Sequence, residues 1–127
     1  MNETVSILKD ADAQRPIPSE WRGVLSAIVD AFKEADFSLK RGVPGVLPIP
    51  AHDARRMEDN IKDYGARLIS LPEEAWRTSA CQWMTRYWDV LVDLFTEDEG
   101  VSDLVLAVRV YEKDQKYVFD VQSVHVP

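Results

Sequence analysis

The sequence predicts an α+β fold in which two N-terminal amphipathic helices pack on a C-terminal antiparallel sheet of about four strands, curved into a cone-like roll. Apolar residues recur at helical spacing over residues 20–35 and 51–64, whereas residues 87–126 alternate between apolar and polar. The alternating segments are joined by short polar connections, which favour hairpins. A chain of 127 residues fits a single domain, here 1–127, that buries a core without a disulfide or a metal.

The first helix follows a leader of residues 1–17. We expect this leader to be weakly ordered or to dock late, because Pro16 and Pro18 interrupt any helix that begins upstream. Ser19 offers an N-cap for the helix over residues 20–35. An apolar stripe at spacings of three and one predicts that helix: Trp21, Val24, Leu25, Ile28, Val29 and Phe32.

The middle of the chain lacks a sustained period before the second helix. Residues Phe37–Leu39 are compatible with a short strand, and the apolar, proline-rich stretch 43–50 either packs over the core or forms a contact surface. Packing is favoured, since an exposed apolar loop lowers solubility. The second helix is expected over residues 51–64, with Gly65 as the residue that ends it.

The second half of the chain is predicted to form mainly strands. Residues 68–71 look like a short strand stopped by Pro72, and residues 73–77 form either a helical turn or the entry to a strand at 78–84. Three longer strands follow at 87–95, 103–111 and 116–126, and their short polar loops make them antiparallel neighbours.

The alternation divides these strands into two faces. The apolar face, expected to pack against the helices, carries Trp88, Val90, Val92, Leu94, Leu104, Leu106, Val108, Val110, Tyr117, Phe119 and Val121. The opposite, mixed face carries Tyr87, Asp89, Leu91, Asp93, Phe95, Val105, Ala107, Arg109, Tyr111, Val118, Asp120, Gln122 and Val124. A matching register places Asp89 opposite Arg109 and Ala107 opposite Asp120, so that Asp120 lies diagonal to Arg109. These charges form either a surface ladder or the lining of a polar pocket that something partly covers.

Composition and motifs exclude several function classes. A net charge of −7 without a stripe of Lys or Arg argues against a nucleic-acid partner. No apolar run is long enough for a membrane span, and the single Cys81 favours a reducing, cytoplasmic location. No phosphate-binding glycine loop or metal-ligand spacing occurs, so we expect neither a cofactor nor a metal.

The acidic segment 96–103 supplies the leading candidate site. Its spacing does not fit a calcium loop, because the closing position falls on Leu106, so it reads as a hairpin tip. We expect the protein to be non-enzymatic and to bind a basic partner, as an immunity-like protein does: the tip steers the partner and exposed rings anchor it. The residues of this expected partner site are Glu97, Asp98, Glu99, Asp103, Tyr87 and Tyr111.

Two alternatives use the mixed face of the sheet. One is a small-molecule or enzymatic pocket lined by Asp89, Asp93, Arg109, Asp120 and His125. Two aspartates four residues apart on one strand are separated by about 13 Å, which is long for two carboxylates that act on one bond. Neither histidine has a catalytic partner nearby in the sequence. The other alternative is a homodimer that buries this face between two copies.

The run Tyr87-Trp88-Asp89-Val90-Leu91-Val92-Asp93-Leu94-Phe95-Thr96 continues through Glu99-Gly100 and Ser102-Asp103-Leu104 to Val124-His125-Val126. Over about the last forty residues it resembles an uncharacterised family of small bacterial domains of unknown function. The order of helices followed by a curved sheet is also similar to the nuclear-transport-factor-2-like and cystatin-like folds. That likeness concerns the fold alone and implies roles as different as isomerases, ligand binders and immunity proteins.

Overall fold

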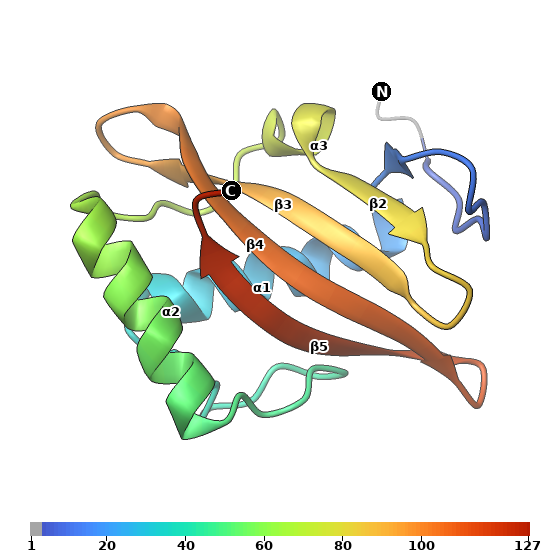
Figure 1. The fold of residues 1–127 in the computed structure, drawn as a ribbon, viewed down its shortest axis with the longest axis horizontal. Coiled ribbons are helices and arrows are strands. Elements are labelled where there is room, and N and C mark those ends of the chain that lie inside the picture. The colour runs from blue at the N-terminus through green and yellow to red at the C-terminus, as the bar shows by residue number, and fades with distance from the viewer. Residues whose placement is uncertain (1–3) are drawn as a thin grey trace.

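The computed structural model describes residues 4–127 and shows an open antiparallel sheet with helices packed on one side (Figure 1). The helices are α1 (Ser19–Lys33), α2 (Ala51–Tyr64) and α3 (Ala75–Thr78). The strands are β1 (Arg15–Pro16), β2 (Ala80–Trp83), β3 (Trp88–Thr96), β4 (Gly100–Lys113) and β5 (Lys116–His125), in the spatial order β1-β2-β3-β4-β5. The predicted α+β class is confirmed, with five strands in the described residues rather than about four.

Helix α1 lies behind the sheet and supplies one wall of the core (Figure 1). Its predicted stripe is largely buried, and the Trp21 ring makes edge-to-face contacts with Trp88, Tyr117 and Phe119 at centroid distances of 5.2, 5.6 and 6.1 Å. Such pairs stabilise beyond the area they bury. The predicted N-cap is wrong: Ser19 is the first helical residue and makes no capping bond within the helix.

The predicted apolar face of the sheet is confirmed as the core. Val90, Val92 and Leu106 are 0% exposed, and Val108 is 2% exposed. Because successive side chains of a strand point to opposite faces, their neighbours in β3 and β4 lie on the other side of the sheet. The mixed face is therefore the one that points away from α1.

A β-bulge in β5 corrects two details of the predicted register. Ala107 pairs with Ser123 while Val108 pairs with Val121, so Gln122 is an extra residue without a partner opposite it. One extra residue reverses the parity of everything that follows it. Val124, expected on the mixed face, is therefore buried in the core.

The same pairing overturns the expected positions of Ala107 and Asp120. Asp120 lies directly opposite Arg109 rather than diagonal to it, and Ala107 does not face Asp120. The predicted Asp89–Arg109 pair is confirmed. Beyond the bulge, His125 comes to the mixed face and pairs with Val105.

Segments between the helices and β2 also differ from expectation. Residues Phe37–Leu39 form a turn instead of a strand, with the Leu39 N–H donating to the Asp36 carbonyl and Leu39 in the left-handed region at φ 58°. Of the expected strand at 68–71, only Leu68 makes a bridge, to Thr96 of β3. The ambiguous stretch before β2 is the helical turn α3.

The sheet edge at β5 is partly covered, and the edge at β1 is only two residues long. The proline-rich loop lies against β5, where the Phe119 N–H donates to the Gly45 carbonyl and the Leu47 N–H donates to the Phe119 carbonyl. At the opposite edge, β1 pairs with β2. A partly covered edge and a two-residue edge strand both hinder extension of the sheet by a further chain.

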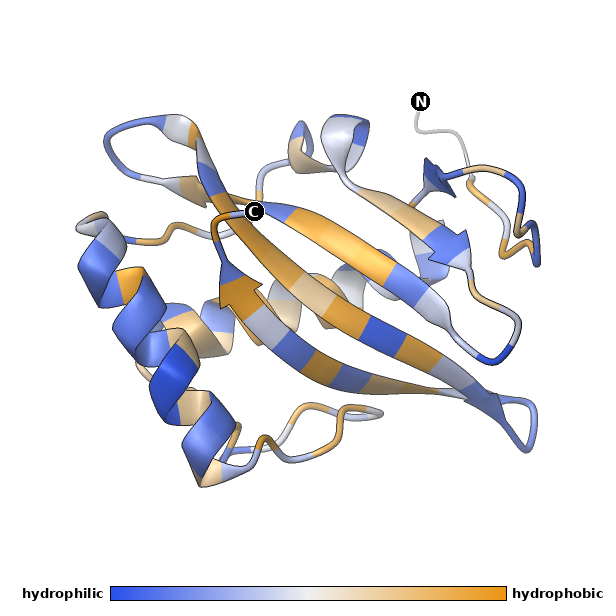
Figure 2. Ribbon diagram, viewed as in Figure 1, coloured by the Kyte–Doolittle hydropathy of each residue, from blue (hydrophilic) through white to orange (hydrophobic). Residues whose placement is uncertain are grey.

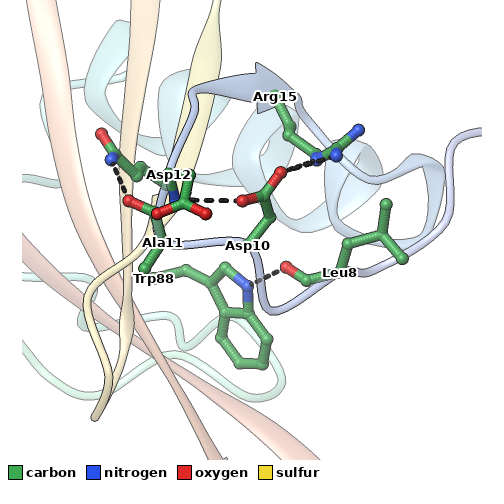
Figure 3. A network of polar contacts seen from close by, with 7 residues as sticks. Leu8, Asp10, Ala11, Asp12, Arg15 and Trp88 are labelled. Atoms are coloured by element: carbon green, nitrogen blue, oxygen red, sulfur yellow. Dashed lines mark hydrogen bonds and ion pairs between the residues drawn. The ribbon is translucent and has the colours of Figure 1, made fainter.

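The leader, as far as it is described, lies against the sheet (Figure 3). The Trp88 Nε1–H donates to the Leu8 carbonyl at 2.9 Å, and the Gln82 side-chain amide donates to the Ala11 carbonyl at 2.8 Å. Residues 4–17 are thus docked, whereas Met1–Glu3 lie outside the described residues. Whether this segment docks late in folding stays a prediction.

Candidate functional site

The mixed face of the sheet is open around Leu91, whereas Phe95 and Val105, which were expected on the same face, are buried. In Figure 1 strands β3, β4 and β5 lie in front of α1 with no helix before them, and Figure 2 shows polar and apolar residues interspersed along them. We call this surface the open face. At its centre, Leu91 lies opposite Ala107, which lies opposite Ser123. Leu91 is 42% exposed, so a large apolar side chain meets solvent in the middle of the sheet.

A charged row crosses the open face next to Leu91. Asp89, Arg109 and Asp120 occupy directly opposed positions on three neighbouring strands. The Arg109 Nε lies 4.0 Å from an Asp89 carboxylate oxygen, and both side chains are more than 40% exposed. A pair that is this long and this exposed contributes little to stability, on the order of 0–1 kcal/mol. The row is consequently available for other partners.

Two tyrosines flank the arginine of this row. The Arg109 guanidinium lies over the Tyr87 ring at 4.5 Å, and the Tyr87 and Tyr111 rings are 5.6 Å apart. Hydrogen bonding with Tyr111 raises the pKa of Arg109 further above its ordinary value, and the nearby tyrosines and Asp89 act in the same direction. The three side chains form a preorganised cluster, which we call the tyrosine–arginine cluster.

Toward the other end of the open face, Asp93 is held by hydrogen bonds within the fold. The Thr78 hydroxyl donates to the Asp93 carboxylate, and the Asp93 N–H donates to the Ser79 hydroxyl oxygen at 3.0 Å. These bonds tie α3 to β3. The Asp93 carboxylate is thus engaged within the fold, four residues along the strand from Asp89, as the sequence implied.

His125 is set apart from the other residues of the predicted pocket. Its Nδ1 lies 2.8 Å from the Ser123 hydroxyl, and its ring lines a depression of about 400 Å³ between α2 and the ends of β4 and β5. Asn60, Asp63 and Tyr64 form the α2 side of this depression. The depression at His125 includes none of Asp89, Asp93, Arg109 and Asp120.

The acidic tip between β3 and β4 is attached to α2. The Tyr64 hydroxyl donates to a Glu99 carboxylate oxygen at 3.0 Å and accepts the Asp103 N–H at 3.1 Å. The bond from Asp103 lowers the pKa of the Tyr64 phenol, but Glu99, burial and the charge of Asp103 outweigh it and raise the pKa overall. Glu97 and Asp98 are exposed at the tip. Sequence reasoning missed Tyr64, since it lies 35 residues from Glu99.

The tip and the tyrosine–arginine cluster lie at opposite ends of the sheet. Asp103 and Tyr111 belong to the same strand β4 and are eight residues apart, which corresponds to about 26 Å. An interface of standard size covers about 800 Å² of each partner, a patch roughly 30 Å across. One partner of domain size therefore reaches from the tyrosine–arginine cluster to Asp103, and Glu97 and Asp98 lie farther along the hairpin.

Within residues 4–127, no three or more His, Cys, Asp or Glu side chains gather closely enough to hold a metal ion. No helix of the described chain has the length and apolar character needed to cross a membrane. The fold and the site thus define an α+β domain with an open antiparallel sheet that has helices on one face and a mixed surface on the other.

The chain belongs to the family described as Domain of unknown function (DUF7668), which matches residues 29–127. The match confirms the resemblance to a family of unknown function and extends well beyond the forty residues that suggested it. No curated protein and no solved structure matches the chain. A bacterial origin and the likeness to nuclear-transport-factor-2-like folds stay predictions.

Proposed function

We propose that this protein binds a basic protein partner through the open face of its sheet. The observation that carries the proposal is the tyrosine–arginine cluster beside the exposed Leu91, a part of the sheet that no helix within residues 4–127 covers. Tyrosine and arginine are enriched among the residues that dominate binding energy at interfaces. The cluster is held in place by its own contacts, so little side-chain entropy is lost when a partner docks.

The face of the sheet is more accessible to a partner than its edges are. The backbone of β5 is bonded at Phe119 by the loop at Gly45 and Leu47, and the opposite edge strand β1 has only two residues. Recognition by addition of a strand needs a free edge. Side-chain contacts on the open face are the mode that this arrangement supports.

The charge of the protein favours a basic partner. The net charge is −7, and Glu97, Asp98 and Asp103 are exposed at one end of the open face. Such a charge distribution accelerates encounter with a positively charged surface. The distance of about 26 Å from Asp103 to Tyr111 favours a folded domain over a short peptide.

An immunity-like role, in which the protein neutralises a basic toxin domain, is the specific form of this proposal. It places the protein in a bacterial cytoplasm. Its support is the charge complementarity, the single cysteine and the resemblance of the last forty residues to small bacterial domains.

Two leucines of matched exposure provide the test. Leu91 on the open face is 42% exposed, and Leu47 in the loop beside β5 is 44% exposed. The substitutions Leu91→Asp and Leu47→Asp therefore add the same charge at equally exposed leucines in different places. Wild type and both variants would be used for affinity capture from the native cell, with bound proteins quantified by mass spectrometry.

The expected result is a stoichiometric basic protein that wild type and Leu47→Asp retain and Leu91→Asp loses by about tenfold or more. Equal retention by both variants would refute the open face as the binding surface. Charge reversal at Glu97 and Asp98 is expected to weaken capture at low salt, and unchanged capture would exclude the tip. If the wild type sediments as a dimer and the Leu91→Asp variant as a monomer, the open face serves self-association instead.

A further inference from the structure

A second surface, on the side of the helices, combines an apolar floor with positive charge. Two adjoining depressions of about 410 and 590 Å³ share Ala35, Phe37 and Glu58, so together they form one groove between the C-terminal end of α1 and the side of α2. The floor contains Phe32 and Phe37, whose rings stack at a centroid distance of 5.4 Å. We call this surface the helix groove.

Five cations line the helix groove of a protein that is acidic overall. They are Lys33, Lys40, Arg55, Lys62 and Arg67. Two carboxylates, Asp36 and Glu58, also line the helix groove, and both have partners within the fold.

The two carboxylates are used locally. Asp36 accepts the N–H groups of Lys40 and Arg41 at 2.9 and 3.2 Å, and Glu58 forms an ion pair with Lys62 at 3.2 Å. Lys40, Arg55 and Arg67 have no ion-pair partner within residues 4–127. The helix groove therefore carries a net positive charge beside an aromatic floor.

Helix electrostatics accounts for only part of this charge. Lys33 and Lys62 lie in the last turns of α1 and α2, where a cation is favoured by the helix dipole. Arg55 is five residues into α2, toward the end where the dipole favours anions, and Arg67 lies beyond the helix. The helix dipole does not account for the positive charge at these two positions.

We infer that the helix groove binds an acidic chain segment that carries an apolar or aromatic anchor residue. The anchor packs on Phe37, and acidic side chains on either side of it meet Arg55 and Arg67. Both halves of the groove are open to solvent, which suits a segment lying along the surface better than an enclosed small molecule. The inference is independent of the open face, which lies on the other side of the sheet.

The test is a titration of the isotope-labelled full chain, followed by NMR, with a synthetic peptide of glutamates and serines around one central phenylalanine. Amide shifts are expected around residues 33–40 and 55–67. Two control peptides, with glutamine for glutamate and with alanine for phenylalanine, are each expected to bind about tenfold more weakly. Saturation by the control peptides at the same concentration would overturn the inference, as would shifts spread over the whole surface.

Matched charge reversals locate the binding. The double substitution Arg55→Glu with Arg67→Glu is expected to weaken the peptide by about tenfold or more, since two attractive charges become repulsive. Lys113→Glu with Lys116→Glu makes the same change in net charge at exposed positions of β4 and β5, and binding is expected to be retained. Equal weakening of peptide binding in both variants would show that binding depends on net charge alone. It would refute the helix groove as the binding site.

Two further outcomes separate this inference from its competitors. If the aromatic sulfonate ANS binds in the helix groove while the peptide does not, the site is one for a small anion, and the inference fails. Leu91→Asp is expected to leave peptide binding unchanged. The proposal for the open face and the inference for the helix groove can therefore be refuted separately.

Discussion

Substitution of one valine in the core and one at the surface tests the division of the sheet into two faces. Val90 of β3 is 0% exposed, and Val101 of β4 is 53% exposed. Replacement of valine by alanine removes two methyl groups, worth about 1.6 kcal/mol of transfer free energy when both are buried. A cavity left in the closely packed core adds about 1 kcal/mol. Val90→Ala is therefore expected to lower the free energy of unfolding by about 2.5 kcal/mol.

The same change at Val101 removes methyl groups that are half in water and leaves no closed cavity, so about 0.8 kcal/mol is expected. Urea unfolding followed by circular dichroism measures both values. For a domain of this size, Tm is expected to fall by about 10 °C for Val90→Ala and about 3 °C for Val101→Ala. Equal losses, or a larger loss at Val101, would refute the assignment of the core face.

Three other predictions follow from single contacts. Tyr64→Phe removes the hydroxyl that accepts the Asp103 N–H, so hydrogen exchange of that amide is expected to accelerate by about tenfold, with global unfolding unchanged as the control. Burial raises the pKa of the Cys81 thiol from 9.0 to about 11, so its reaction with DTNB at pH 8 is expected to be about a hundredfold slower than in urea. The contribution of the neutral Cys81 thiol to the free energy of unfolding is complete below pH 9 and is lost as the pH rises through 11. The substitution Cys81→Ala is expected to remove this pH dependence. Lys9→Ala removes an ion pair and the ammonium 5.2 Å from the Trp83 ring centroid, and is expected to cost about 0.5 kcal/mol in urea unfolding; no change would show the contact to be neutral.

The sequence predicted the elements whose signals are local. Residues 51–64 were expected as a helix and form α2 with the same bounds, because the apolar stripe stops at Tyr64 and Gly65 adopts the left-handed conformation at φ 81°. The apolar face of the three long strands was predicted for the same reason, since a period of two needs only neighbours in the chain. Both predictions therefore depend on the spacing of apolar residues within single segments of the chain.

The failures arose where distant partners decide the structure. Nothing in Arg15–Pro16 marks a strand, and β1 exists only because β2 pairs with it. Ser19 was expected to cap α1, but its hydroxyl accepts the N–H of Val5 at 2.7 Å. The bulge at Gln122 had a visible signal, since Val121 and Val124 break the alternation, but the pairing that fixes it belongs to β4.

The candidate surfaces differ in how far the sequence could reveal them. The sequence predicts the Asp89–Arg109 pair because strand parity and short hairpins determine which residues face each other. The helix groove had no such signal: Lys33, Arg55 and Arg67 are spread over 35 residues, and only the packing of α2 beside α1 brings them together. Surfaces between elements require tertiary structure.

The unit that folds extends beyond the part of the chain that defines the family. The family match begins at residue 29, within α1, yet Trp21 is 1% exposed and touches three aromatic residues of the sheet. A fragment of residues 29–127 would leave the rings of Trp88 and Phe119 facing water, and truncation of a buried aromatic residue alone costs about 3–5 kcal/mol. That loss is a large fraction of the stability of an ordinary domain. Ile17, Trp21, Leu25 and Ile28 are therefore part of the core that supports the open face, although they precede the matched residues.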